Sequence, residues 1–108
     1  MKAWKAPVFI LRRAIDAERE EVLSSSIDDE GRRGLLVFAS PEEAKEIAKQ
    51  GGMEDLEPHP VTAATIEETC RGHSFVLVGF WGLETEDDIS VFTSEQAVAL
   101  LEEIEEKS

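Results

Sequence analysis

The chain has 108 residues and a mass of 12.0 kDa, which predicts one globular domain over residues 1–108. Its 24 acidic and 11 basic residues give a net charge of −13, which argues against nucleic acid or an anionic membrane as a partner. No segment reaches the roughly 20 apolar residues of a membrane-spanning helix, and the single cysteine excludes an internal disulfide, so we expect a cytoplasmic protein.

The first half of the chain predicts two buried strands and a capped helix. Apolar, β-branched runs at residues 8–11 and 35–39 predict the strands. A capping box begins at Ser40, a proline follows it, and the glycine pair at 51–52 ends the helix. The polar connection at 14–33 is compatible with a strand extension or a short helix.

The second half alternates turn-forming residues with apolar runs and helix caps. In chain order it predicts a loop at 53–60, a short edge strand at 60–63, a helix opened by a capping box at Thr65 and ended by Gly72, a central strand at 74–81, a solvated hairpin loop at 84–88, a strand at 89–92 and a final helix capped by Thr93 or Ser94.

The resulting element order is β-β-α-(β)-α-β-β-α. It predicts an α+β domain, a two-layer sandwich in which about three helices cover one face of a mostly antiparallel or mixed sheet. The apolar strand at 74–81 leaves a three-layer arrangement as the alternative. Residues 37–40 and 91–94 lead from strand to helix in the same way, 54 residues apart. A duplicated ββα unit and an independent use of the same strand–cap–helix pattern both account for this echo.

The order of elements and the segment 36–44 (Leu-Val-Phe-Ala-Ser-Pro-Glu-Glu-Ala) resemble the N-terminal domain of the SseB-like family of small bacterial proteins. Where that family tends to carry an Asn-Pro turn, this sequence has Gly-Phe-Trp-Gly at residues 79–82. The resemblance implies an accessory or interaction role in a bacterial protein and carries over no catalytic residue.

One group of residues suggests chemistry. Glu67, Cys70 and His73 recur every third residue of a predicted helix, and a thiolate beside an imidazole can act as a nucleophile or bind a metal. The alternative is a buried, inert Cys70, with Glu67 paired to Arg71 on the surface. A zinc site would also need His59, and zinc-ligand spacing is absent, so we expect no metal and no cofactor.

The acidic excess is concentrated in residues 55–108, which carry a net charge of −11 against −2 for residues 1–54. The acidic residues expected to contact a partner are Glu84, Glu86, Asp87, Asp88, Glu102, Glu103, Glu105 and Glu106. The last four lie where a helix dipole favours cations, so either the final turn frays or a basic partner compensates. Trp81 is a further contact residue if exposed and a core residue if buried.

Two adjacent arginine pairs stand out in the first half: Arg12, Arg13, Arg32 and Arg33. If the strands at 8–13 and 34–39 are antiparallel neighbours, both pairs fall near one end of the sheet and form an anion-binding patch. The alternative is a solvated hairpin end in which the arginines pair with Asp28, Asp29 and Glu30.

These features predict a non-catalytic protein-interaction domain whose acidic second half contacts a basic protein partner. An immunity or inhibitor protein for a basic enzyme is a specific form of this hypothesis. A small enzyme using Cys70 and His73 is the alternative from another class. Self-association into a homodimer, through an exposed edge strand or the arginine cluster, is a further alternative.

Overall fold

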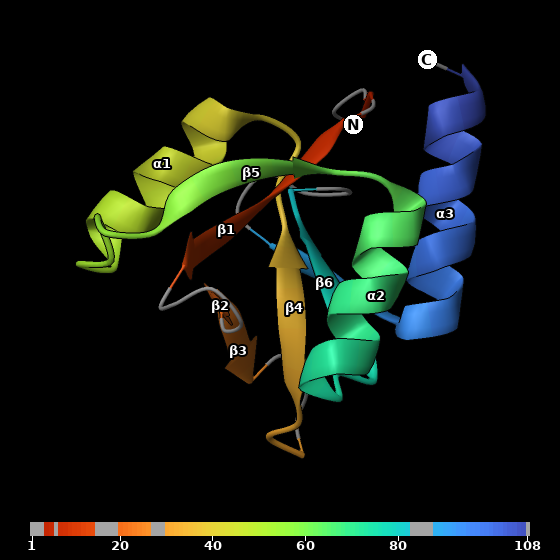
Figure 1. Ribbon diagram of the computed structural model, residues 1–108, viewed down its shortest axis with the longest axis horizontal. Helices are drawn as coiled ribbons and strands as arrows, with labels where there is room; N and C mark the ends of the chain where they lie inside the picture. Colours follow the sequence, from red (N-terminus) through yellow and green to blue (C-terminus); the bar gives the residue numbers. More distant parts are fainter. Residues whose placement is uncertain (1–3, 6, 15–19, 27–29, 83–87, 108) are drawn as a thin grey trace.

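Two small sheets and three helices make up the part of the chain that the computed structural model describes, residues 4–5, 7–14, 20–26, 30–82 and 88–107 (Figure 1). The strands are β1 (Val8–Ala14), β2 (Glu20–Val22), β3 (Ser24–Ser26), β4 (Arg33–Val37), β5 (Glu57–Val61), β6 (Leu77–Trp81) and β7 (Ile89–Thr93), and the helices are α1 (Pro41–Gln50), α2 (Ala63–His73) and α3 (Ser94–Lys107). The α+β class and the predicted order of elements are confirmed.

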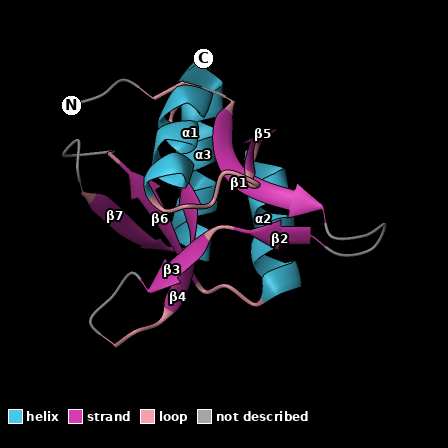
Figure 2. Ribbon diagram, turned by 90° about the vertical axis from the view of Figure 1, so that its left-hand side faces the viewer, coloured by secondary structure: helices cyan, strands magenta, loops and turns pink. Residues whose placement is uncertain are grey.

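The sheets have the strand orders β2-β1-β5 and β3-β4-β6-β7, with β4 and β6 parallel and every other pair antiparallel. They meet where Phe9 and Phe38 exchange two backbone hydrogen bonds of 2.9 and 2.8 Å. Beyond this bridge β1 and β4 diverge, and β2 and β3 line the opening (Figure 2). Between β2 and β3, Leu23 donates to the carbonyl of Leu11 and accepts from the amide of Leu36. The segment that the sequence left open therefore joins the two sheets.

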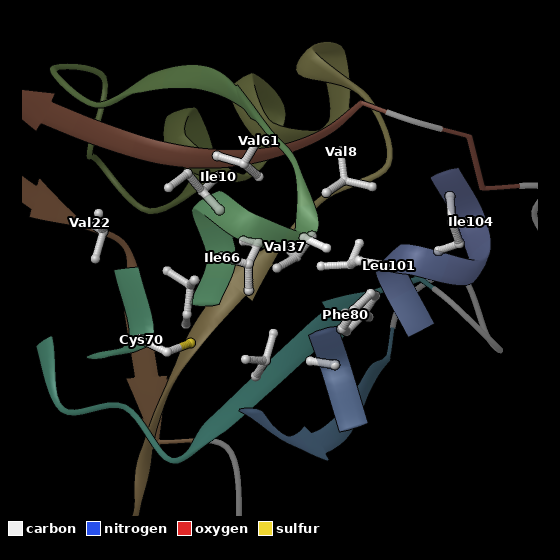
Figure 3. Close-up of a cluster of buried hydrophobic side chains, with 14 residues drawn as sticks. Val8, Ile10, Val22, Val37, Val61, Ile66, Cys70, Phe80, Leu101 and Ile104 are labelled. Carbon is white, nitrogen blue, oxygen red and sulfur yellow. The ribbon is translucent and has the colours of Figure 1, made fainter. Parts of the chain in front are cut away.

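Buried side chains form two clusters on opposite faces of the central strands. Ile10 belongs to one cluster and Leu11 to the other, and consecutive residues of a strand point to opposite faces. Helices α2 and α3 supply buried residues to the first cluster, shown in Figure 3, and α1 supplies Ala44 and Ala48 to the second. The prediction that the helices cover one face therefore holds for α2 and α3. Helix α1 packs on the other face.

Side-chain caps fix where the helices begin. Ser40 accepts from the amide of Glu43 at 3.3 Å, as predicted for α1. Thr93 caps α3 and exchanges hydrogen bonds with Gln96. The predicted start of α2 at Thr65 is wrong, because Thr62 is the cap and two alanines open the helix. The predicted end of this helix at Gly72 is also wrong, because α2 continues to His73. Among the described residues, no helix has the length and apolar character needed to cross a membrane.

Strand β5 corrects the predicted boundary between a loop at 53–60 and a short edge strand at 60–63, because the strand already begins at Glu57 and includes both prolines. Phe9 pairs with Pro60 in register, yet its own N–H and C=O bond to Phe38 on the opposite side of β1. The pair is therefore of the non-hydrogen-bonded kind, and the same alternation applies to Pro58, opposite Leu11. Both proline nitrogens face the outer edge of the sheet, where no N–H is needed.

Truncating the central aromatic side chain tests this core. Phe80 is 0% exposed, and its ring centroid lies 5.3 Å from that of Trp4 and 5.4 Å from that of Phe92. We expect Phe80→Ala to lower the free energy of unfolding by about 3–5 kcal/mol in urea titrations. The control Val76→Ala, at a side chain that is 57% exposed, should change it by less than about 0.5 kcal/mol. Similar effects of the two variants would contradict the assigned core.

Candidate functional site

Helix α3 presents a stripe of exposed carboxylates. Glu95, Glu102 and Glu106 are exposed and are spaced seven and four residues apart, which places them on one side of the helix. The opposite side carries Ala97, Leu101 and Ile104, which are buried in the first cluster. We call the three exposed glutamates the acidic stripe.

The basic residue of α3, Lys107, does not neutralise this stripe. It donates to Glu103 at 3.2 Å, four residues earlier on the helix. Glu103 was one of the predicted contact residues, and it is held in this exposed ion pair. The acidic stripe therefore keeps its charge toward solvent on a helix that contains five glutamates and one lysine.

Glu105 differs from its neighbours because it is part of the fold. Its carboxylate accepts a 2.7 Å hydrogen bond from the amide of Ala63, the first residue of α2. The first turn of α2 contains no acidic residue of its own, so Glu105 supplies the negative charge that a helix N-terminus favours. The glutamates at the end of α3, which looked unfavourable from the sequence, thus include one that stabilises another helix. No sequence pattern indicated this contact, because the predicted start at Thr65 placed Glu67 and Glu68 in the first turn of the helix.

The predicted acidic loop is described only at its last residue. Asp88 is exposed, and its Oδ1 atom accepts from the amide of Ile89 at 2.8 Å. Its carbonyl accepts from the amide of Gly82 at 2.9 Å and so closes the β6–β7 ladder. The predicted contact residues Glu84, Glu86 and Asp87 lie outside the described residues.

Both tryptophans pack against hydrophobic clusters. Trp81 is half-buried against the second cluster together with Ile89, so the core alternative describes its position. Trp4 is half-buried and packs on Phe80, which ties the N-terminal segment to the first cluster. Neither side chain stands free as an exposed anchor.

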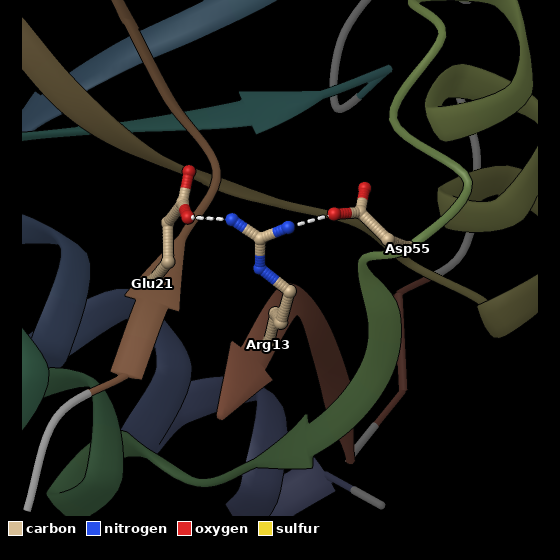
Figure 4. Close-up of polar contacts among 3 residues, drawn as sticks. All are labelled: Arg13, Glu21 and Asp55. Carbon is tan, nitrogen blue, oxygen red and sulfur yellow. Dashed lines mark hydrogen bonds and ion pairs between the residues drawn. The ribbon is translucent and has the colours of Figure 1, made fainter. Parts of the chain in front are cut away.

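The strands that carry the two arginine pairs are neighbours only at the Phe9–Phe38 bridge. Arg13 forms ion pairs with both Glu21 and Asp55 (Figure 4). It lines a cleft of about 340 Å³ whose other lining residues are Arg12, Asp55, Glu57, Pro58 and His59. This cleft holds acidic as well as basic groups.

The second arginine pair lies on β4 and the turn before it. Arg33 donates to the hydroxyl of Ser24 at 3.0 Å, and Arg32 pairs with Glu30 at 3.4 Å. Arg12 lies 3.5 Å from the imidazole Nε2 of His59. The arginines thus have local neighbours on β2, β3 and β5, and an anion-binding patch stays a prediction.

The helix spacing separates Glu67, Cys70 and His73. A three-residue step falls about 60° short of a full turn, so only the middle residue faces the core. Cys70 is 4% exposed in the first cluster, and its burial raises the pKa of the thiol from 9.0 to about 11. Glu67 pairs with Arg71 at 2.8 Å, as the surface alternative predicted. His73 is exposed and stacks on Phe75 with ring centroids 5.5 Å apart.

A catalytic or metal-binding arrangement of Cys70 and His73 is therefore not assembled in this geometry. Within the described ranges, no three His, Cys, Asp or Glu side chains are grouped so as to hold a metal ion. Comparison of the chain with protein-family models, curated proteins and solved structures finds no match. The resemblance to the SseB-like family stays a prediction.

The bond from Glu105 can be tested with its exposed neighbour as a control. Glu105→Ala should lower the free energy of unfolding by about 1–2 kcal/mol, because the amide of Ala63 loses its acceptor. Glu106→Ala should be neutral or stabilising by a few tenths of a kcal/mol, since it removes negative charge from the last turn of α3. Urea unfolding followed by circular dichroism measures both. Equal losses would contradict the capping role.

The state of Cys70 can be tested by thiol modification. At pH 8 an aromatic disulfide reagent should react with the folded protein at least about 100-fold more slowly than with the protein in guanidinium. A pKa of about 11 in place of 9.0 lowers the thiolate fraction by that factor. Comparable rates in the two states would show an accessible thiol and would revive the nucleophile hypothesis.

The raised pKa of Cys70 makes the stability of the fold depend on pH. Because the folded pKa lies above the unfolded one, burial of the Cys70 thiol stabilises the fold fully below pH 9, and this contribution is lost as the pH rises toward 11. Cys70→Ala should therefore show a smaller loss of unfolding free energy over this range than the wild-type protein.

Proposed function

We propose that this protein is an interaction domain that binds a basic protein partner through the acidic stripe of α3. The stripe carries the proposal, because Glu95, Glu102 and Glu106 point to solvent along one side of a single helix. Eleven residues of helix separate the first from the last, a length of about 16 Å. A basic surface of ordinary size can contact all three carboxylates at once.

Electrostatic interactions favour the binding of a basic partner to the acidic stripe. Glu102 and Glu106 lie in the last turns of α3, where negative charge opposes the helix dipole at a cost of about 0.3–1 kcal/mol each. A cationic partner removes part of this cost, and the net charge of −13 speeds the encounter with it. Glu105 is excluded from the contact, since it caps α2.

The same proposal includes a more specific role and a cellular location. An inhibitor or immunity role toward a basic enzyme fits the small size and the charge of the chain. A cytoplasmic location fits its one cysteine, which is a free, buried thiol. The alternative of a cysteine enzyme has less support, because Cys70 and His73 lie in different environments.

The experiment is capture of proteins from a lysate of the source organism on the immobilised domain. The double variant Glu102→Gln with Glu106→Gln should retain about fivefold less of the captured protein, which should be basic. Capture should also weaken as salt rises from about 50 to 300 mM. Because these changes relieve the dipole of α3, unfolding cannot explain a loss.

The matched control is Glu42→Gln with Glu54→Gln, which removes the same charge at two exposed residues elsewhere on the domain. This control should capture as much as the wild-type protein. Equal losses in both double variants, or capture that is insensitive to salt, would contradict a specific acidic contact.

A further inference from the structure

Four of the described strands lie at sheet edges, and two of them, β5 and β7, differ in what they offer a further strand. The outer edge of β5 presents Pro58 and Pro60, which have no N–H to donate. Strand β7 closes the other sheet beyond β6 and contains neither proline nor a charged residue (Figure 2). Of these two edges, β7 is therefore the one whose backbone can accept an added strand.

The register shows which groups of β7 point outward. At its two ends, Gly82 donates to the carbonyl of Asp88 and Ser94 donates to the carbonyl of Val76. Hydrogen-bonded pairs therefore fall on every second residue of this ladder. Val91, opposite Gly79, lies in a non-hydrogen-bonded pair. Its N–H and C=O point away from β6, toward the free edge.

Side chains already cover the outward donors on both sides of Val91. Asp88 Oδ1 accepts from the amide of Ile89 at 2.8 Å, and Gln96 Oε1 accepts from the amide of Thr93 at 3.1 Å. In the described part of the chain, no such bond reaches the outward amide of Val91. Val91 is also 39% exposed, and its partner across the strand pair is Gly79. Val91 is thus the open point of the edge.

The charges around this edge distinguish between two occupants. If a second copy paired antiparallel through Val91, Asp88 would face residue 94 of that copy, next to its Glu95. Acidic residues would meet at both ends, between chains that each carry −13. A segment with basic residues at its ends would instead meet Asp88 at one end of β7 and Glu95 at the other. Charge complementarity therefore favours an extended basic peptide.

We infer that β7 accepts an extended basic segment of the partner as an added strand, paired at Val91 and flanked by Asp88 and Glu95. This inference rests on the proposed function, because it names how the basic partner attaches. The backbone bonds supply the position, and the acidic flanks select the charge. A β-branched residue opposite Val91 would pack against the exposed Val91 side chain.

The test uses the synthetic peptide Lys-Lys-Val-Thr-Val-Lys-Lys, blocked at both ends, and the intact protein. At low salt the peptide should slow hydrogen exchange of the Val91 amide at least tenfold, as measured by NMR. The same peptide, N-methylated on its second, fourth and sixth residues, keeps its charge but loses the N–H donors that face β7 when the fourth residue lies opposite Val91. It should bind about tenfold more weakly, and equal binding would overturn the inference.

Two protein variants localise the site. Val91→Pro removes the outward N–H and leaves the bonds to β6 in place, whereas Val91→Thr keeps the N–H and the branched shape. We expect at least about a tenfold loss of peptide affinity for the first and less than about threefold for the second. If Val91→Pro fails to fold, the inference is still tested by comparing how the plain and the N-methylated peptides bind the wild-type protein.

The remaining outcomes separate the two proposals. Peptide protection confined to the end of α3 would overturn the β7 inference and leave the acidic stripe as the contact. A wild-type dimer that Val91→Pro converts to a monomer would identify a second copy as the occupant and overturn the inference. Failure of the peptide to bind, together with capture that does not depend on Glu102 and Glu106, would overturn both.

Discussion

The two backbone hydrogen bonds between Phe9 and Phe38 are the constraint on which the rest of the structure depends. They join the sheets at one point and orient β1, so that its free groups on the other side select the register of β5. They also hold Phe38 in place, and Phe38 lies two residues before Ser40, the cap of α1. Because β1 and β4 diverge from this point, the strands that carry the arginine pairs separate, and β2 and β3 occupy the opening.

Burial on both faces of the central strands explains how so small a chain obtains a core. Residues on β1 and β4 alternate between the two clusters, so the apolar side chains at 8, 10–11 and 35–37 are buried on both faces of these strands. Each helix then needs only a narrow apolar side, which leaves the rest of its surface for charge. The acidic stripe on α3 is a direct result, since Leu101 and Ile104 anchor the helix without involving its outer side.

Local patterns predicted much of this fold, and tertiary contacts explain what they missed. The helix cap at Ser40 and the apolar run of β6 are encoded in consecutive residues, and both were predicted, although β6 begins at Leu77 and not at residue 74. A short edge strand at 60–63 was predicted, but the start of β5 at Glu57 was missed, because the effect of a proline depends on which way its nitrogen faces, and β1 decides that. The bond from Glu105 to Ala63 joins residues 42 apart in sequence, so no local pattern contains it.

The same distinction applies to the charged residues. A run of glutamates at the end of α3 predicted exposed acids, and it could not tell which of them would be used inside the fold. The arginines show the reverse case. Adjacent arginines suggested a common patch, whereas Arg13 lies between two carboxylates that come from β2 and from the loop before β5. Charge density and a pair four residues apart on one helix, such as Glu67 with Arg71, are readable from sequence, but pairs between different elements are set by their packing.

The edges of the sheets show two different ways of limiting strand addition. On β5 the protection is permanent, because Pro58 and Pro60 have no amide hydrogen to expose. On β7 it is exchangeable, because Asp88 and Gln96 are exposed side chains whose single bonds to the backbone are each worth only about 1 kcal/mol. An incoming strand that pairs first at Val91 can displace both acceptors, while their presence discourages unspecific pairing. The difference between a missing donor and a covered one therefore separates a closed edge from a selective one.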